Sequence, residues 1–574
     1  MIACVLKHED GSLYMENQFI SENYFDLLIP NVSLGTLNPN IVVTRVNNTY
    51  SIFHLPYEDV IKCDFRVFGY NNIPKCFILE STYVLETTGV KRVQSNPNLA
   101  LMGTGVLIGI IDSGINYLHP AFLFNDNTSR ITSIWDQTIN PSDPPVMTED
   151  FPYGTIYTKE DINRALKQPY PLEVVPTDDQ IGHGTAIAGI AGGSVDNAND
   201  FSGVAPLAEF VVVKMKQAKN ITKDFLSIPR DVICYQETDV MMGVKYVEKV
   251  AQQLNRPLAL CIALGSNQGS RDGLGPLSSY LNDLSELPRT CVSCSAGNQG
   301  NTRRHYSKAI RSLDEYTDVE FNVAVNDKKF FIEIWTQPIL RISLDIISPS
   351  GERIENLAPA FSQTTLHTFV FGPTKLCVKN VPTIPITGDQ LIWLRFEDTQ
   401  SGLWTLRIHN IDRTNAEVNA WLPAGGTITN DTYFIQSDSF TTITTPGDTV
   451  SPITISSYDT LTGGISVFSS KGYTRVNEIK PDLVAPGTEL TAPASTNGYV
   501  NVSGTGAAAA VNAGIVALLF EWAITRGYYT GITGVEIKTF LIRGAERDLL
   551  IDYPNRTWGY GKVNLYGVFE KLII

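Results

Sequence analysis

The chain has 574 residues, a length that allows roughly three to four domains of ordinary size. With 43% hydrophobic and 18% charged residues, its composition is that of a folded protein and excludes bulk disorder or a fibrous repeat. Lys and Arg number 44 against 59 Asp and Glu, and the resulting net charge of -15 argues against a general nucleic-acid binder.

The first residues carry no basic segment followed by an apolar one, so we expect no ordinary secretory signal and synthesis in the cytoplasm. The longest apolar stretch, residues 507–524, contains Asn512, Gly514 and Glu521. A bilayer span tolerates such polar interruptions poorly, so this stretch predicts a buried helix and no transmembrane segment.

Residues 1–94 are predicted to form a separate N-terminal unit of mixed α+β structure. From residue 95 onward the sequence alternates between apolar runs and stretches with helical periodicity, as in residues 185–191 and 239–254. The apolar runs lie at residues 105–115, 210–213, 258–264 and 291–296. This alternation predicts an α/β fold with a doubly wound parallel sheet, built from residues 95–306 and 438–574.

The pattern changes in residues 307–422, where short segments of alternating polarity are separated by the turn sequences PSGER, TGDQ and DTQSG. Several short strands with closely spaced turns are typical of a two-layered β domain. We therefore predict an inserted all-β domain at residues 307–437, folded as a β-sandwich or jelly roll.

Three short motifs carry residues that could perform chemistry. The segment IIDSGINYLHPAF contains Asp112, DDQIGHGTAIAGIAGG contains His183, and VSGTGAAAAVNAGIVALL contains Gly506. Each motif alone is weak, because a strand-terminal Asp, a helix opened by Gly-His-Gly-Thr and a Gly-Thr-Gly before alanines are as often structural as functional. In this order, with the strands between them, they resemble the subtilisin-like serine proteases.

Further segments carry the same resemblance. ALGSNQG, residues 263–269, resembles the segment that lines the substrate cleft in that family, and SAGNQGN places Asn298 at the position of the oxyanion-hole amide. FSSKGYT, IKPDLVAPG and WGYGKVNLYGVFE resemble the approach to the nucleophile and the end of the catalytic domain. The resemblance implies a cleft lined by Ala263, Leu264, Gly265, Ser295, Ala296 and Gly297.

The chemistry of such a site needs a Ser hydroxyl to attack a carbonyl, a His to take its proton, and an Asp to hold the His in the required tautomer. Asp112 and His183 fit the last two roles. Gly506 stands where the resemblance expects the nucleophile, and glycine has no side chain to attack anything. The sequence therefore predicts a vestigial triad and a catalytically inactive pseudoprotease.

Three alternatives stay open. A displaced nucleophile, Ser503 or Thr505, would have to bring its hydroxyl within roughly 2.6–3.2 Å of His183. An engineered change at Gly506 would make the natural protein an active serine endopeptidase. In the third alternative, the chain is a structural scaffold with no saturable ligand or partner.

A narrower resemblance rests on TSRITSIWDQT, YGTIYTKEDINRAL and ETTGVKRVQSNP, and on a β-insert placed after Asn298. Over nearly the whole chain these features resemble the clostridial germination subtilases, the Csp family. In that family a prodomain assists folding, a jelly-roll insert braces the catalytic domain, and active members process a cortex-hydrolase zymogen. The resemblance implies a prodomain at residues 1–94 that stays attached, because self-removal near Val93 and Gln94 needs an active nucleophile.

The function implied by this resemblance is regulation or sensing in spore germination by a spore-associated protein. Its partners would be another germination subtilase, the cortex-hydrolase zymogen or a small-molecule germinant.

We expect neither a cofactor nor a metal. Cys291 and Cys294 form a single CxxC without the second pair that a zinc site needs, and no acidic segment has the spacing of an EF-hand. Four acidic residues are expected to lie in solvated loops: Asp126, Asp178, Asp179 and Asp196.

Overall fold

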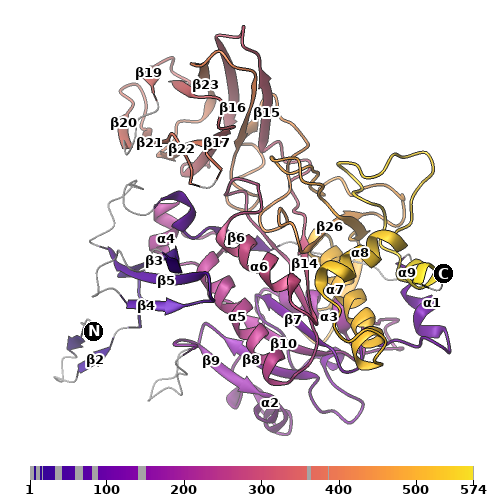
Figure 1. The fold of residues 1–574 in the computed structure, drawn as a ribbon. Helices are drawn as coiled ribbons and strands as arrows, with labels where there is room; N and C mark the ends of the chain where they lie inside the picture. The colour runs from indigo at the N-terminus through magenta and orange to yellow at the C-terminus, as the bar shows by residue number, and fades with distance from the viewer. Residues whose placement is uncertain are drawn as a thin grey trace.

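The computed structural model describes residues 5–7, 13–15, 17–32, 42–57, 69–79, 88–139, 150–358, 364–385 and 387–572 (Figure 1). Its centre is an eight-stranded sheet in which the neighbouring strands are parallel, except for the antiparallel pair β8 and β9. In spatial order the strands are β27 (Leu483–Pro486), β26 (Ile453–Tyr458), β14 (Thr290–Ser295), β12 (Leu258–Ile262), β7 (Leu107–Asp112), β10 (Glu209–Lys214), β8 (Ile131–Asp136) and β9 (Thr155–Thr158).

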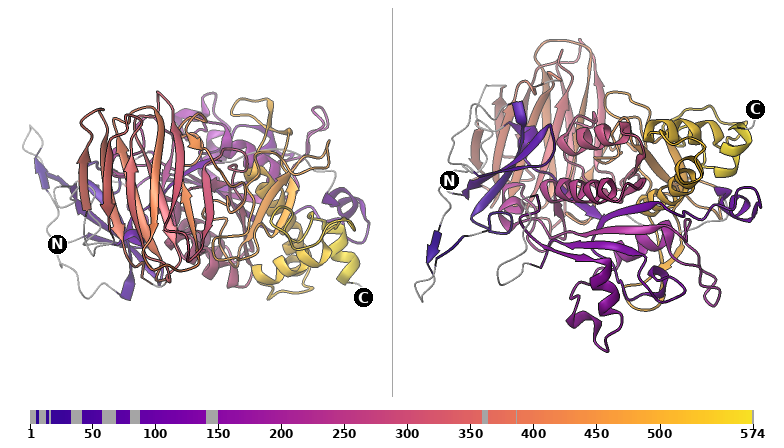
Figure 2. Two further views of the ribbon diagram at one scale, coloured as in Figure 1. Left: turned by 90° about the horizontal axis from the view of Figure 1, so that it is seen from above. Right: turned by 60° about the horizontal axis from the view of Figure 1, so that its bottom comes forward.

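Helices cover both faces of this sheet, as Figures 1 and 2 show. Alternate side chains of β7 point to opposite faces, so that Ile108 and Ile110 pack in one apolar cluster and Leu107 and Ile111 in another. The first cluster includes α3 (His183–Gly192) and α7 (Thr505–Phe520), and the second includes α5 (Glu237–Gln253) and α6 (Pro276–Glu286). The predicted α/β fold with a doubly wound parallel sheet is confirmed.

The helix α7 is apolar on all sides and buried along its whole length. Among the described residues, only the helical segment Thr505–Thr525 is long and apolar enough to cross a membrane, but 89% of its apolar window is buried inside the fold. A helix that is hydrophobic all round and surrounded by protein is a core helix.

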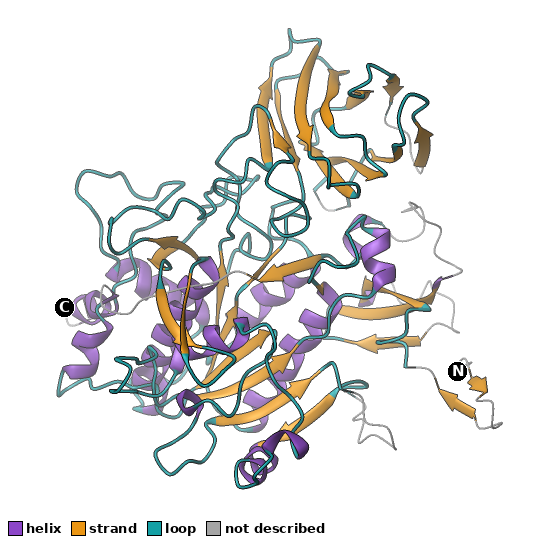
Figure 3. Cartoon of the chain, turned by 180° about the vertical axis from the view of Figure 1, so that it is seen from behind, coloured by secondary structure: helices purple, strands orange, loops and turns teal. Residues whose placement is uncertain are grey.

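The inserted domain consists of two antiparallel sheets that enclose an apolar core of their own (Figure 3). The first sheet contains β15 (His305–Ile310), β24 (Ala416–Trp421), β17 (Phe330–Thr336), β22 (Gln390–Glu397), β21 (Lys375–Val381) and β20 (Thr364–Thr368). The second contains β19 (Arg353–Leu357), β18 (Ile342–Ile347), β23 (Gly402–Asn410), β16 (Tyr316–Val323) and β25 (Tyr433–Phe434). Two sheets packed face to face form a β-sandwich, as the sequence predicts. The jelly-roll order of its strands stays a prediction.

The N-terminal unit contributes an antiparallel sheet of β3 (Tyr24–Pro30), β5 (Tyr50–Pro56) and β4 (Val42–Arg45). Leu28 and Ile52 of this sheet join the apolar cluster of α5 and α6. Phe25 instead packs with α4 (Asn220–Phe225) and with residues of the insert. The sheet is thus held between the central domain and the inserted domain.

Candidate functional site

Asp112 and His183 form a hydrogen-bonded pair at the centre of the molecule. Asp112 is the last residue of β7, His183 is the first residue of α3, and His183 Nδ1 lies 2.7 Å from Asp112 Oδ1. The same oxygen accepts the backbone N–H of Ser113 at 2.7 Å, and Asp112 is 1% exposed. Because a carboxylate only accepts, Nδ1 carries the proton and Nε2 is the nitrogen able to take one, as in a general base.

Asp179 holds the strand and the helix of this pair together. Its Oδ1 accepts from Ser113 Oγ and Gly182 N, both at 2.8 Å, and its Oδ2 accepts from Thr185 N at 2.9 Å and Thr185 Oγ1 at 2.7 Å. The N–H of Gly184 in turn donates to Ser113 Oγ at 2.9 Å. Asp179 is therefore a carboxylate cap at the start of α3.

The expectation of a solvated loop is wrong for Asp179, which is 2% exposed. The hydroxyl and amide donors around it compensate its burial. Its place just before Gly-His-Gly-Thr is the signal that could have revealed the cap. Asp126 lies at an exposed position, Asp196 is half-buried and accepts from the Tyr499 hydroxyl at 2.8 Å, and Asp178 forms an ion pair with Lys214 at 3.1 Å.

The glycine after His183 is required by close packing. A Cβ at Gly184 would lie 2.2 Å from the carbonyl oxygen of Gly114 and 3.0 Å from the Cβ of Asp112. Any larger residue would push α3 away from the end of β7. The hydrogen bond between Asp112 and His183 requires α3 to lie close to the end of β7. This close approach explains why a glycine follows His183.

Gly506 is the second residue of α7, in the position where the sequence predicts the missing nucleophile. It is buried and its backbone is helical, with no positive φ. The preceding residue, Thr505, donates from N at 2.9 Å and from Oγ1 at 3.1 Å to Asn298 Oδ1. These bonds join the first turn of α7 to the loop after β14, so Asn298 lies beside the start of the helix.

The two hydroxyls considered as substitutes are both held by neighbours. Thr505 Oγ1 accepts the N–H of Gly297 at 3.0 Å in addition to its bond with Asn298. Ser503 is exposed and its Oγ accepts the N–H of Glu489 at 3.4 Å. These contacts favour structural roles for both side chains.

Part of the predicted cleft is occupied by a strand from the N-terminal unit. The strand β6 (Cys76–Leu79) lies between β11 (Tyr235–Gln236) and β13 (Leu264–Gly265) and pairs antiparallel with both. Leu79 is opposite Leu264, and Ile78 is opposite Gly265. This is β-strand addition, in which an extended segment completes the hydrogen bonding of two strand edges.

Sequence reasoning missed β6. Its only local signal is the short apolar run CFIL, which is too brief to distinguish a strand by periodicity.

The other predicted cleft residues directly precede β13 or lie at the end of β14. Ala263, Ser295 and Ala296 are buried, and Ser295 Oγ donates to the carbonyl of Leu264 at 3.2 Å. Gly297 has φ +106°, and a Cβ there would lie 2.6 Å from side-chain atoms of Thr444. The structure thus brings the predicted cleft residues together around the loop that carries Asn298.

Val93 and Gln94 lie in a helix rather than on the cleft strand. They belong to α1 (Val90–Ser95), which packs on α9 (Leu565–Leu572). Val93 is fully buried, and Gln94 Nε2 donates to the carbonyl of Val204 at 2.9 Å. Cleavage there would require α1 to unwind, so the predicted junction remains a prediction.

Within the described parts of the chain, no group of three or more His, Cys, Asp or Glu side chains is arranged to hold a metal ion. Cys291 and Cys294 are both buried on β14, and burial raises the pKa of Cys294 to about 12.

A sheet wound in this way, with Asp112 and His183 paired at its centre, defines the subtilisin-like class. The sequence profile of the subtilase family (peptidase S8) matches residues 103–320 and 423–561, on both sides of most of the inserted domain, and the chain belongs to this family. The structure is similar to that of the Clostridium perfringens CspB protease, with 30% sequence identity and a TM-score of 0.75. That match covers 85% of this chain and 96% of CspB.

Two further solved structures are more distant. The S41 psychrophilic protease is 15% identical, with a TM-score of 0.41, over 84% of this chain and 99% of its own. Sphericase is 14% identical, with a TM-score of 0.42, over 83% of this chain and 97% of its own. No curated protein matches the sequence.

Proposed function

We propose that this protein is a catalytically inactive subtilase, a pseudoprotease that acts by binding. The observation that carries the proposal is the glycine at position 506, in a chain whose Asp112–His183 pair is assembled. Without a hydroxyl at position 506, the acyl-enzyme of a serine protease cannot form there. A serine protease without its nucleophile still accelerates hydrolysis about 10³- to 10⁴-fold over the uncatalysed reaction in water. That rate is far below a physiological rate.

An N-terminal unit that stays attached is consistent with this reading. Asp26 of β3 is fully buried and accepts from His54 Nδ1 at 2.6 Å, Lys219 Nζ at 2.9 Å and Gln236 Nε2 at 2.6 Å. Lys219 and Gln236 belong to the central domain, so charged and polar bonds join the two units. With β6 placed in the cleft, binding of partners would use other surfaces.

The role in spore germination rests on the resemblance to the Csp family and on the similarity to the CspB protease of Clostridium perfringens. In this proposal the chain is spore-associated and regulates another germination subtilase or the cortex-hydrolase zymogen, or responds to a small-molecule germinant.

An activated fluorophosphonate probe tests the loss of catalysis, with the CspB protease as the positive control. We expect covalent labelling of CspB and none of this protein, measured by intact mass. Labelling that disappears in Ser503→Ala or Thr505→Ala would identify a displaced nucleophile and contradict the proposal. A Ser codon at position 506 in the native gene would restore the alternative of an active endopeptidase.

The remaining alternative, a structural scaffold, predicts no saturable partner. Pull-down with candidate germination proteins and calorimetry with candidate germinants separate a scaffold from a regulator. We expect saturable binding to one of them.

A further inference from the structure

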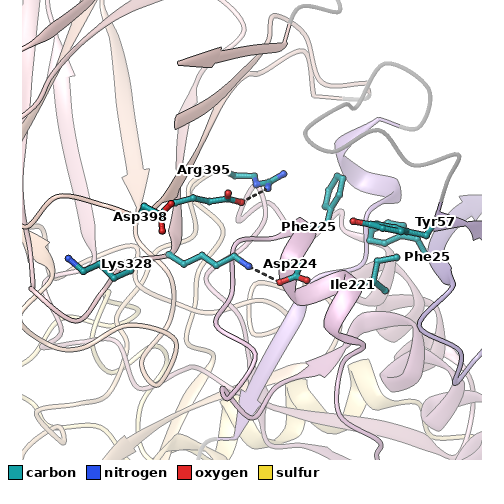
Figure 4. Close-up of a pocket in the computed structure, with 10 residues that line it drawn as sticks. Phe25, Tyr57, Ile221, Asp224, Phe225, Lys328, Arg395 and Asp398 are labelled. Carbon is teal, nitrogen blue, oxygen red and sulfur yellow. Dashed lines mark hydrogen bonds and ion pairs between the residues drawn. The ribbon is translucent and has the colours of Figure 1, made fainter. Parts of the chain in front are cut away.

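A cavity of about 420 Å³ lies where the N-terminal unit, α4 and the inserted domain meet (Figure 4). Its volume is within the range of about 300–1,000 Å³ that is typical of small-molecule sites. It is lined by Phe25, Tyr57, Ile221, Asp224, Phe225, Lys328, Lys329, Arg395, Glu397 and Asp398. None of these residues belongs to the vestigial triad or to the predicted cleft.

One wall of the cavity is apolar. Phe25, Ile221 and Phe225 contribute buried hydrophobic side chains, and the rings of Phe25 and Phe225 lie 5.0 Å apart between centroids. Tyr57 is 40% exposed at the edge of this wall. Figure 4 shows these four side chains together on one side, opposite Lys328, Arg395 and Asp398. A ligand with an apolar body would find a preformed surface there.

The opposite wall is charged, and its three carboxylates all have cationic partners: Glu397 pairs with Arg395 at 3.5 Å, and the other two pair with residues outside or at the edge of the cavity. Asp224 accepts from Lys329 Nζ at 2.8 Å and from Arg230 Nη2 at 2.6 Å. Asp398 pairs with Lys375 at 2.9 Å. Neither carboxylate is therefore available to neutralise another cation of the cavity.

The guanidinium of Arg395 has a hydrogen-bond donor without a partner. It is 3% exposed, its Nε donates to Ser227 Oγ at 3.0 Å, and its Nη2 reaches Glu397 only at 3.5 Å. Its Nη1 is buried and has no hydrogen-bond partner among the described residues. A buried donor of a charged group without a partner is costly, so an anion at this point would be stabilising.

Lys328 supplies the surplus charge. Its Nζ donates to the carbonyl of Thr399 at 3.3 Å and forms no ion pair with a carboxylate of the described residues. Each carboxylate of the cavity has a cationic partner of its own, and Asp224 has two, so the ammonium of Lys328 adds to a surplus of positive charge. An anionic group in the cavity would neutralise part of this surplus.

We propose that this cavity binds a carboxylate with an apolar body, whose carboxylate bonds to Arg395 and Lys328 while its body packs on Phe25, Ile221 and Phe225. Guanidinium and carboxylate form strong, geometrically specific hydrogen-bond pairs. Such a ligand would be the germinant of the proposed sensing function, so the biological role of the cavity rests on that proposed function. Binding itself does not depend on the loss of catalysis.

Calorimetry with 1-naphthylacetate and its neutral isostere 1-naphthylacetamide tests the assignment on the full-length chain. The two probes differ only in the charged group, so we expect the acid to bind at least about tenfold more tightly than the amide. Equal affinities for acid and amide, or no binding of the acid at millimolar concentration, would overturn it.

Variants locate the site. Arg395→Gln should abolish the preference for the acid, and because Arg395 is buried, its folding is checked by circular dichroism. The exposed Lys328 allows a safer change, and Lys328→Ala should weaken binding of the acid several-fold. Lys308→Ala, at an exposed position on β15 outside the cavity, is the matched control and should bind like the wild type.

Unchanged affinity in Lys328→Ala would overturn the assignment even if Arg395→Gln fails to fold. Fluorophosphonate labelling is measured on the same samples. A failure at the cavity is thereby distinguished from a failure of the pseudoprotease proposal.

Discussion

His183 Nδ1 lies 2.7 Å from Asp112 Oδ1, in the arrangement that orients a general base, although the chain offers this base only Gly506 at the nucleophile position. The pair is held by contacts that do not involve position 506. Asp179 bonds to Ser113 and to the first turn of α3, so strand and helix stay in place without a nucleophile. The arrangement of Asp112 and His183 therefore does not depend on the presence of a nucleophile.

Gly506→Ser should restore covalent reactivity. The backbone of Gly506 is helical without a positive φ, so a serine fits there without backbone strain. We expect fluorophosphonate labelling of the variant, and none when His183→Ala is added, because the hydroxyl would then lack its base. Intact-mass spectrometry provides the measurement.

The same variant locates any self-cleavage. Peptide mapping would distinguish a cut between Leu79 and Val90, after the strand in the cleft, from a cut at Val93 and Gln94 within α1. An unlabelled and intact chain of 63.2 kDa, in a variant with the circular dichroism of the wild type, would show that the site has lost more than its nucleophile.

Asp26→Ala should destabilise the N-terminal unit strongly. Burial alone would raise the pKa of Asp26, but Lys219 and His54 outweigh it and hold the pKa below its ordinary value of 3.8. The contribution of this carboxylate is therefore present above pH 3.8 and lost as the pH falls below it. Removing it leaves the buried ammonium of Lys219 uncompensated, at a cost of about 3–5 kcal/mol in the free energy of unfolding.

Urea unfolding at pH 7 measures this effect, with Glu315→Ala as the control. Glu315 pairs with Arg413 on the surface, where the two side chains are 71% and 52% exposed, so its removal should change stability by less than about 0.5 kcal/mol. Equal stabilities of the two variants would show that the buried network does not hold the unit.

The sheet, the inserted β domain and the meeting of Asp112 with His183 could be predicted because each leaves a local signal. Buried parallel strands are continuous apolar runs in the sequence, whereas strands of a sandwich alternate apolar and polar residues. The Gly-His-Gly motif reflects the close approach of α3 to β7. The pairing of β6 with β11 and β13 leaves no such signal. It joins segments more than 150 residues apart, and the partner of a short apolar strand is decided by tertiary packing.

The role of Asp179 was hidden for a different reason. A carboxylate that caps a buried helix and one that lies in a solvated loop have the same neighbours in sequence, here Gln180 and Ile181. The Gly-His-Gly-Thr motif that follows is a signal for the cap, but the burial of Asp179 depends also on Ser113, which approaches from β7. Burial of a polar residue depends on partners that the chain supplies from elsewhere.

Stability should depend on pH through His305. This residue is buried between β24 and the chain near Phe440, with its ring stacked on Trp421 at 4.7 Å, and burial lowers its pKa from 6.5 to about 4. Because the unfolded chain binds the proton more readily, stability is fully present above pH 6.5 and falls between pH 6.5 and 4, by about 3 kcal/mol in total.

Urea unfolding across this range, compared with His305→Gln, isolates the contribution. Glutamine does not titrate, so the variant should lose that part of the pH dependence while other groups keep theirs. The same slope in both proteins would contradict the assignment.

The strand in the cleft should be released by Phe77→Ala. Phe77 is fully buried in the cluster of α5 and α6, and its truncation removes about 3–5 kcal/mol of packing from a strand of only four residues. We expect faster hydrogen exchange at the amides of β6 in the variant and unchanged exchange in β7, which belongs to the central sheet. Phe371→Ala, at a side chain that is 74% exposed, is the control and should leave both strands unchanged. If the amides of β6 already exchange as fast in the wild type as those of the hairpin β28 (Leu490–Pro493) and β29 (Tyr499–Val502), the strand does not remain in the cleft in solution, and the cleft would then be open to a partner peptide.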